Sequence, residues 1–378
     1  MPHLAALLLQ GENNAVEFKS TAVTADSIAK EIVAFANTLG GSILIGVEDN
    51  GHVSGVNNPS QVEEWVTNIC RQNVIPPLQV LIHVEKQDDL SVIHIEVPKG
   101  KDKPYQTNKN QYLVRVGSTN RTASPQELSR LFQQAGVFHF DATGVSNTSI
   151  TDLNWSKLDQ YFNQYNVDFS KETDKERLLI NTDLMTPEGE VTIAGLLVFG
   201  INPQKYLYNA SISFAHFDGN SLEDDLLDKR VIEGTLDYQI DTCLASIKNN
   251  IKDPSVIEGG KTVSTTFLYP DKVFREIIVN ACLHRNYAIS GSRIRVFLFN
   301  DRLEIRSPGR LPNTVTIEKM KSGVSYALNP VLLKFMENLR YIDKLGRGIP
   351  MVYQTALRNN KELLLEETGE EFVLTLTF

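Results

Sequence analysis

The 378-residue sequence has little cysteine, and the three cysteines that it contains, Cys70, Cys243 and Cys282, are scattered along the chain. They form no C-x-x-C pair and have no histidine at a metal-ligand spacing, which argues for reduced core residues rather than a zinc site or a disulfide framework. Long apolar runs are also absent, since none approaches the roughly eighteen residues of a membrane-spanning helix. The N-terminal segment lacks the basic start and the cleavage site of a signal peptide. We therefore expect a cytoplasmic protein without a membrane partner.

Excess positive charge is the next feature that the sequence lacks. The formal net charge is −9, which argues against a protein that coats nucleic acid through bulk electrostatics but leaves room for a local basic patch. Hydrophobic residues make up 42% of the chain and charged residues 22%, as in a globular protein with little disorder. The length predicts two or three domains.

The order of the apolar patterns predicts a mixed α/β (α+β) fold in several parts. The first module, residues 1–136, alternates helical patterns with short β-branched runs, which is typical of a partly antiparallel sheet. Ser124, Pro125 and Glu127 form a helix-start signal that closes this module. Residues 137–149 lack periodicity and are predicted to be a linker. An intermediate α/β segment at 150–270, with a predicted buried strand at 194–200, leads to a C-terminal module at 271–378.

A polar stripe marks the start of the C-terminal module. On a helix over residues 275–287, Glu276, Asn280 and His284 recur at i, i+4 and i+8 and share one face. A carboxylate can orient or deprotonate a water, and an amide oxygen can complete the coordination of Mg²⁺ or Mn²⁺ beside phosphate oxygens. Gly346 and Gly348 would let backbone N–H groups approach those phosphates. The stripe is a candidate nucleotide site, although a solvated helix face followed by an ordinary loop has the same pattern.

Further motifs follow in order: LEIRSPGRLP at 303–312, Asn329-Pro330, and GRGI at 346–349. With the E-x-x-x-N stripe they resemble the ATPase module of the GHKL superfamily, in the divergent form of bacterial Schlafen/AlbA-like proteins. The resemblance implies an α/β sandwich in which Glu276 is the water-activating base, Asn280 is the Mg²⁺ ligand, and Gly309, Gly346 and Gly348 lie near bound ATP. The Asp that usually binds the adenine amino group is missing, because the equivalent turn reads Ser307-Pro308-Gly309.

The first module carries three acids that a fold could bring together. Glu12 and Glu17 precede Lys19, and Asp49 follows the predicted strand at 43–47. Carboxylates that meet in a fold either share a divalent cation or lie apart in solvent. With a cation, the three acids would form a phosphodiester-cleaving site in which Lys19 offsets the charge on the phosphate. The alternative is structural, since Asp49-Asn50-Gly51 is also good turn chemistry.

The motifs around these acids resemble the Schlafen AlbA-like domain. They are VEFK at 16–19, AFANT at 34–38 with Gly40 and Gly41, IGVED at 45–49, and YLVRVGS at 112–118. In the Schlafen branch that cleaves RNA, two glutamates and an aspartate form the metal site, and Glu12, Glu17 and Asp49 align with them. The resemblance implies nucleic-acid binding and a nuclease site with Mg²⁺ or Mn²⁺. Much of the bacterial class keeps the same acids and is described only as DNA- or ATP-binding.

Basic residues gather in one stretch of this module. The predicted nucleic-acid contacts are Lys99, Lys101, Lys103, Tyr105, Lys109, Arg115 and Arg121. Cations with interspersed aromatic side chains suit phosphate contact and base stacking on single-stranded RNA or DNA. A charged hairpin loop without a partner is the alternative.

Together these features predict a nucleic-acid-binding protein with a nuclease site in its first module and a nucleotide-binding module at its C-terminus. By analogy, such a protein would suit a stress or phage-defence effector. One alternative is a non-catalytic ATP-binding transcriptional regulator. Another is an ATPase whose N-terminal module only docks nucleic acid, and a third is a scaffold that has lost both activities. A homo-oligomer is compatible with each of these interpretations.

Overall fold

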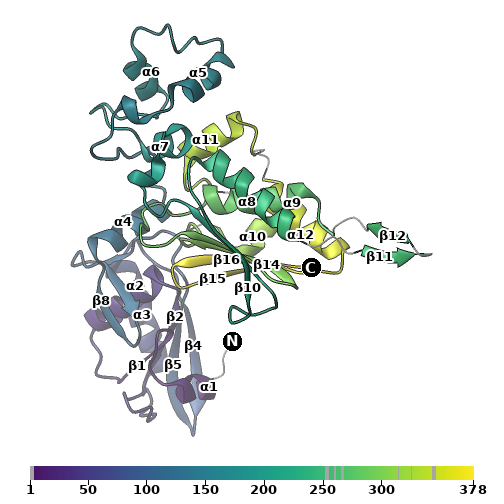
Figure 1. The fold of residues 1–378 in the computed structure, drawn as a ribbon. Helices are drawn as coiled ribbons and strands as arrows, with labels where there is room; N and C mark the ends of the chain where they lie inside the picture. The colour runs from purple at the N-terminus through teal and green to yellow at the C-terminus, as the bar shows by residue number, and fades with distance from the viewer. Residues whose placement is uncertain are drawn as a thin grey trace. The chain divides into compact units, whose positions relative to one another are not determined.

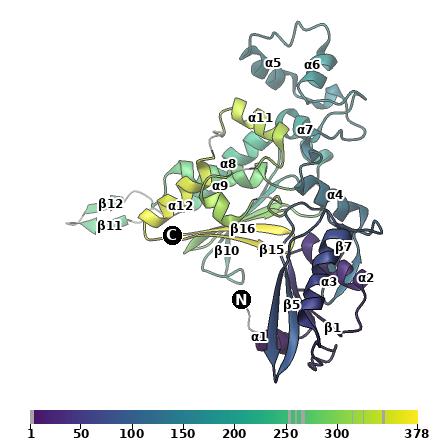
Figure 2. The ribbon, with the colours of Figure 1, turned by 180° about the vertical axis from the view of Figure 1, so that it is seen from behind.

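The computed structural model describes residues 4–251, 255–258, 261–264, 268–313, 315–324, 326–342 and 346–378, with the backbone alone for 255–258 and 261–264. The chain forms two compact units, Met1–Phe138 and His139–Phe378. Each unit has its own sheets and hydrophobic core (Figures 1 and 2). In the described part of the chain, no helix combines the length and the apolar character that crossing a membrane requires.

The first unit is built on a four-stranded mixed sheet of order β1-β2-β5-β4, in which β1 and β2 run parallel and the other neighbours antiparallel. Two small antiparallel pairs of strands, β3-β6 and β7-β8, accompany it. In chain order the elements are α1 (Leu4–Gln10), β1 (Val16–Lys19), α2 (Ala25–Asn37), β2 (Gly41–Ile45), α3 (Pro59–Gln72), β3 (Val74–Ile75), β4 (Leu81–Gln87), β5 (Leu90–Val97), β6 (Gln106–Thr107), β7 (Leu113–Val116), β8 (Thr119–Thr122) and α4 (Pro125–Gln134). The predicted mixed sheet is confirmed.

Helices α2 and α4 show how local sequence sets this unit. Ile28, Ile32 and Phe35 recur on one face of α2 and are fully buried in the core. The predicted capping box at the start of α4 is confirmed, because the Ser124 hydroxyl accepts from the Glu127 N–H while the Glu127 carboxylate accepts from the Ser124 N–H.

The opposite face of the four-stranded sheet carries a polar relay. His94 lies between Ser42 and Glu85, with Nε2 2.9 Å from the Ser42 hydroxyl and Nδ1 2.9 Å from Glu85 Oε1. The other Glu85 oxygen accepts from the backbone N–H of Leu4, the first residue of α1. His94 is 2% exposed, so this relay satisfies buried polar groups and fixes α1 to the sheet.

The second unit is built on a six-stranded sheet of order β10-β9-β13-β14-β16-β15, in which only the β9–β13 pair is parallel. In chain order its elements are η1 (Phe140–Ala142), η2 (Ile150–Asp152), α5 (Trp155–Asn163), α6 (Lys175–Asn181), α7 (Ile193–Phe199), η3 (Pro203–Lys205), β9 (Ile212–Phe217), β10 (Leu226–Ile232), α8 (Leu236–Asn250), β11 (Ser255–Glu258), β12 (Lys261–Ser264), α9 (Asp271–Leu283), β13 (Ile294–Leu298), β14 (Arg302–Pro308), α10 (Ile317–Lys321), α11 (Pro330–Asn338), α12 (Gly348–Arg358), β15 (Leu363–Thr368) and β16 (Glu371–Thr377).

Helices α8, α9 and α12 lie on one side of this sheet (Figure 1). Strand residues that face them, such as Phe214, Val296 and Ile305, alternate along β9, β13 and β14 and are buried in the core. Strands β9 and β10 come from the predicted intermediate segment, whereas the other four come from the predicted C-terminal module. The two predicted parts therefore contribute to a single sheet.

The predicted strand at 194–200 is wrong, because these residues form helix α7. Every residue of α7 is buried, and a continuous apolar run of this length does not distinguish a buried strand from a buried helix. The preceding residue decides the outcome: the Thr192 side chain accepts from the Gly195 N–H at 3.0 Å and caps the helix.

The segment predicted to be a linker packs into the second unit. Asp141 is fully buried, and its carboxylate accepts from the backbone N–H of Leu332 at 2.9 Å, in the first turn of α11. The Thr148 hydroxyl accepts from the Val191 N–H at 2.8 Å. Burial raises the pKa of Asp141 to about 6, although its backbone hydrogen bonds act in the opposite direction. The three cysteines are free and buried, as predicted.

Candidate functional site

A pocket opens in the second unit between α9, the end of β14 and the start of α12. All six residues predicted to bind nucleotide line it: Glu276, Asn280, His284, Gly309, Gly346 and Gly348. They come from three segments spread over more than seventy residues of sequence, and the sheet and helices bring them together. The pocket is otherwise walled mainly by apolar side chains, including Ile277, Leu311, Val315, Met320 and Phe372.

Glu276 and Asn280 are coupled on the pocket face of α9. The Asn280 amide nitrogen donates to Glu276 Oε1 at 2.6 Å and to the Glu276 backbone oxygen at 2.7 Å. This arrangement uses the nitrogen of the Asn280 amide and directs its oxygen to other partners. Mg²⁺ takes oxygen ligands, and the Asn280 amide oxygen could coordinate it together with phosphate oxygens, so Asn280 fits the predicted metal role.

Gly348, the first residue of α12, lies directly against the Glu276 carboxylate. A Cβ atom placed on Gly348 would fall 1.6 Å from Glu276 Oε1, so a larger residue would force the Glu276 side chain out of this position. The positive end of the α12 dipole also favours a carboxylate here. Glu276 is therefore held between Asn280 and the start of α12.

The other two glycines that line the pocket also make close backbone contacts. Gly346 has φ +66° and approaches Gly323, such that a Cβ on Gly346 would lie 2.4 Å from the Gly323 oxygen. Gly309 has φ +122° and packs on Asn286, whose backbone N–H donates to Pro308 at 2.7 Å. The sequence analysis missed Gly323, because a glycine just after a short helix is common at helix ends.

The charged and polar groups around the pocket are few. Burial lowers the pKa of His284 to about 4, so its imidazole is neutral at pH 7 and offers one N–H donor. Arg310, which the sequence analysis did not single out, donates to the Gly369 oxygen at 2.6 Å and lies 3.1 Å from Glu370. The Ser307 hydroxyl donates to the Ala281 oxygen at 3.0 Å. Among the described residues, no Asp lines the pocket.

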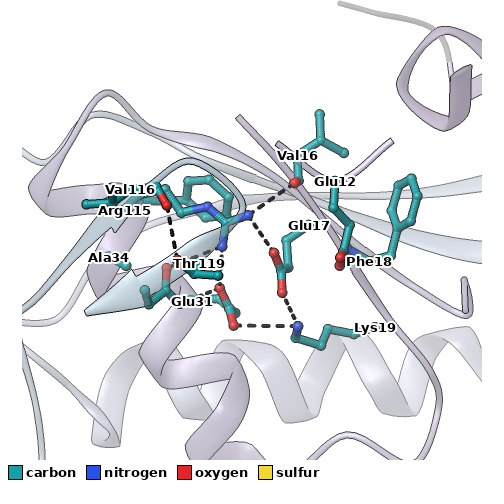
Figure 3. A network of polar contacts seen from close by, with 12 residues as sticks. Glu12, Val16, Glu17, Phe18, Lys19, Glu31, Ala34, Arg115, Val116 and Thr119 are labelled. Carbon is teal, nitrogen blue, oxygen red and sulfur yellow. Dashed lines mark hydrogen bonds and ion pairs between the residues drawn. The ribbon is translucent and has the colours of Figure 1, made fainter. Parts of the chain in front are cut away.

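The acids of the first unit meet cations instead of a cavity (Figure 3). Glu17 is 5% exposed, and its Oε2 lies 2.5 Å from Arg115 Nη2 while its Oε1 accepts from Lys19. Glu31 completes the group, 3.2 Å from Arg115 Nη1 and 3.5 Å from Lys19 Nζ. We call Glu17, Lys19, Glu31 and Arg115 the ion cluster. Its two acids and two bases leave no net formal charge.

The surroundings of the ion cluster change its proton affinities. Burial disfavours the charged form of Lys19, but the hydrogen bond that Lys19 donates to Glu17 and the charge of Glu31 outweigh it and raise the Lys19 pKa. Burial and the charge of Glu17 raise the pKa of Glu31. The sequence analysis missed Glu31, although it occupies the apolar face of α2 between Ile28 and Ile32, where a charged residue needs a partner.

The predicted metal triad is not formed. Glu12 accepts from the Phe18 N–H at 3.1 Å, Glu17 belongs to the ion cluster, and Asp49 is exposed in the turn after Val47. In the described ranges, no group of three or more His, Cys, Asp or Glu side chains could hold a metal ion. Arg115, about 100 residues away in sequence, donates to Glu17 and balances its charge, so Glu17 does not require a metal cation. Lys19 is likewise committed to carboxylates of its own chain.

The predicted basic patch is divided between core and surface. Lys103, Tyr105 and Arg115 are buried: the Lys103 ammonium donates to the Thr38 oxygen at 2.8 Å, and the Tyr105 ring lies in the core. These three side chains support the fold and do not face nucleic acid. Lys109 pairs with Asp26 at 2.9 Å and Arg121 with Glu127 at 2.7 Å, both at the surface. Lys101 is exposed and Lys99 is partly exposed.

Comparison with known proteins agrees with this two-part arrangement. Residues 12–124 match the family model described as "Schlafen, AlbA_2", and residues 291–376 match that described as "Putative ATP-dependent DNA helicase recG C-terminal". The second match begins after α9, so it includes Gly309, Gly346 and Gly348 but not Glu276 or Asn280. No curated protein matches the chain.

Two solved structures are similar to the chain, one over nearly all of it and the other over about a third. The DIP2311 protein from Corynebacterium diphtheriae is 24% identical over 96% of this chain and 75% of its own, with a TM-score of 0.48. The N-terminal domain of a putative ATP-dependent DNA helicase RecG-related protein from Nitrosomonas europaea is 20% identical over 33% of this chain and 95% of its own, with a TM-score of 0.27. The family matches confirm the predicted architecture, in which a Schlafen AlbA_2-type domain precedes a RecG C-terminal-type domain.

Proposed function

We propose that the pocket of the second unit binds a nucleoside triphosphate with Mg²⁺, in a protein whose function concerns nucleic acid. The convergence of six residues from three distant segments on one pocket supports this proposal above all. The descriptions of the two matched families, which name Schlafen AlbA_2 and a DNA helicase, point to the nucleic-acid context.

Each pocket residue has a distinct task in this proposal. Asn280 would hold Mg²⁺ through its amide oxygen, because Glu276 accepts from its nitrogen. Gly346 and Gly348 would bring the start of α12 close to the phosphates, where the helix dipole favours negative charge. Bound Mg²⁺ would neutralise part of the phosphate charge, which matters because Arg310, an arginine of the lining, already lies near Glu370.

The geometry favours binding over turnover. A general base must lie within hydrogen-bond reach of the attacking water, but Glu276 accepts from Asn280 and lies against Gly348. Hydrolysis would require the Glu276 carboxylate to turn from Asn280 toward the attacking water. An ATPase whose first unit only docks nucleic acid is thus the second candidate, and a steady release of phosphate that Glu276→Gln abolishes would favour it.

For the first unit we propose contact with nucleic acid without cleavage at the predicted triad. Lys99, Lys101, Lys109 and Arg121 are the predicted contacts that keep some exposure. Cleavage by Glu12, Glu17 and Asp49 has lost its geometric basis, since Glu17 is committed to Arg115 and Lys19.

Isothermal titration calorimetry of the full chain with a non-hydrolysable ATP analogue and Mg²⁺ tests the proposal. We expect the unmodified chain to bind, Asn280→Ala to weaken binding at least about tenfold, and the exposed control Asn300→Ala to bind as the unmodified chain does. Absence of binding by the unmodified chain would contradict the proposal. So would equal affinities of Asn280→Ala and Asn300→Ala.

A further inference from the structure

Strand β10 ends the six-stranded sheet of the second unit and leaves an unpaired edge. It pairs with β9 on one side, and no strand of the described residues pairs with its other side. Leu227 is 51% exposed and Val231 is 45% exposed along this edge. A seven-residue edge strand with exposed apolar side chains and outward-pointing backbone groups is a template for pairing with another strand.

The opposite edge strand of the same sheet, β15, carries two adjacent acids, Glu366 and Glu367. The Leu311 N–H donates to the Glu367 carboxylate at 2.7 Å. Two β15 strands brought together would oppose like charges, whereas β10 carries charges of both signs, at Asp228, Lys229 and Arg230.

We propose that β10 pairs antiparallel with β10 of a second copy of this chain, with the two-fold axis at Lys229. In this register Asp228, which already pairs with Arg230 of its own strand, lies opposite Arg230 of the other copy, so the two ion pairs join into one alternating group. Leu227 lies in a β-bulge and takes no part in this register. Opposite charges at directly opposed positions stabilise antiparallel strands. The sequence of the strand is thus complementary to itself.

Other registers lose this complementarity. A shift by one residue would place side chains of opposite faces against each other, because successive residues of a strand alternate. Moving the axis to Asp228 would oppose two aspartates, and moving it to Arg230 would oppose two arginines. Centring on Lys229 opposes two lysines, but these are exposed at the surface, where the charge of each is screened.

The surface that one strand pair buries is small, so the dimer should dissociate on dilution in the micromolar range. The two opposed Lys229 ammonium groups weaken it further. Lys229→Thr removes their repulsion and adds a β-branched residue, and it should tighten the dimer about threefold or more.

Analytical ultracentrifugation of the full chain over a range of concentrations tests this proposal. Arg230→Asp opposes acids at both contacts, and Asp228→Arg opposes bases, so each variant alone should be monomeric at concentrations where the unmodified chain is a dimer. An equimolar mixture of the two variants should recover the dimer, because opposite charges then meet only between different copies. Circular dichroism checks that both variants are folded, since Asp228 also pairs with Arg230 of its own strand and accepts from Asn250.

A charge reversal elsewhere in the unit supplies the control. Lys171→Asp changes an exposed residue that pairs only with Asp168 in the same loop, and it should leave the dimer unchanged. An unmodified chain that stays monomeric up to about 100 μM, well above the dissociation constant expected here, would overturn the proposal. A dimer that survives Arg230→Asp, or a mixture that stays monomeric while Lys229→Thr has no effect, would overturn it too.

Discussion

Two glutamates of this chain were predicted to act on phosphate, and the fold treats them differently. Glu17 of the first unit is 5% exposed and meets Arg115 and Lys19, so its charge is balanced within the protein. Glu276 of the second unit lines a pocket, where its carboxylate accepts from the Asn280 amide and lies against Gly348. One motif acid is thus enclosed by side chains of its own unit, whereas the other faces a cavity that can hold a ligand.

The largest effect on stability should come from removing Arg115 from the ion cluster. Arg115→Ala would leave Glu17 and Glu31 buried with only Lys19 between them, and we expect it to lower the free energy of unfolding by about 3–5 kcal/mol. Urea denaturation at pH 7 measures the effect. Arg121→Ala, which breaks an exposed pair with Glu127, should cost less than about 1 kcal/mol. Equal costs for the two variants would break the comparison.

A buried acid that is held mainly by backbone N–H groups sharpens the contrast through pH. The folded-state pKa of Asp141 is raised to about 6, above its unfolded value, so the folded state binds the proton more tightly. Stability should therefore fall as the pH rises from about 4 to about 6, by on the order of 3 kcal/mol. Asp141→Asn keeps an acceptor for the Leu332 N–H and should flatten the profile in that window. A profile unchanged by the substitution would refute this account of Asp141.

Close packing around Glu276 gives a smaller effect. In most exposed helix positions Gly→Ala stabilises, but Gly348→Ala would place a methyl group against the Glu276 carboxylate and should destabilise by about 1–3 kcal/mol. The double variant Glu276→Ala/Gly348→Ala makes room and should regain most of that loss. Gly291→Ala, at a position with nothing within 4 Å, is the control. Thermal denaturation compares all four proteins, and a stabilising Gly348→Ala would contradict the close contact.

Base selectivity should be weak. Because no Asp lines the pocket in the part of the chain that the structure describes and the Ser307 hydroxyl already donates to Ala281, we expect ATP and GTP affinities to differ by less than about tenfold. Competition calorimetry measures the ratio. A strong preference for ATP would mean that another group recognises adenine.

The smallest expected effect concerns the surface of the first unit. Lys101→Ala removes one exposed cation, and if it contacts phosphate it should weaken nucleic-acid binding for all sequences and lower the salt slope by about 1. Filter binding at several salt concentrations measures this. Lys86→Ala, a lysine in β4 outside the predicted patch, is the matched control. Equal behaviour of both variants would remove Lys101 from the proposed interface.

The sequence analysis succeeded where the signal is local. The stripe Glu276, Asn280 and His284 depends only on helical spacing, and the capping box of α4 depends on residues three apart. The family resemblance then placed Gly309, Gly346 and Gly348 in the same pocket. These are features that neighbouring residues or a recurring motif determine.

It failed where a partner is distant in sequence. Nothing near Glu17 indicates that Arg115 would neutralise it, and nothing near Lys103 indicates that its ammonium would donate to Thr38. Helix α7 was taken for a strand because an all-buried apolar run has no periodicity to read. Asp141 was assigned to a linker because its partner Leu332 lies 191 residues away in sequence.

Electron paramagnetic resonance of Mn²⁺ titrated into the full chain, with and without a non-hydrolysable ATP analogue, tests the central contrast most directly. The account predicts that the chain binds Mn²⁺ tightly only when the nucleotide is present, that Asn280→Ala abolishes this binding, and that Asp49→Asn, an exposed change in the predicted triad, leaves it intact. Tight Mn²⁺ binding without nucleotide that Asp49→Asn removes would contradict it and would restore the metal site of the first unit.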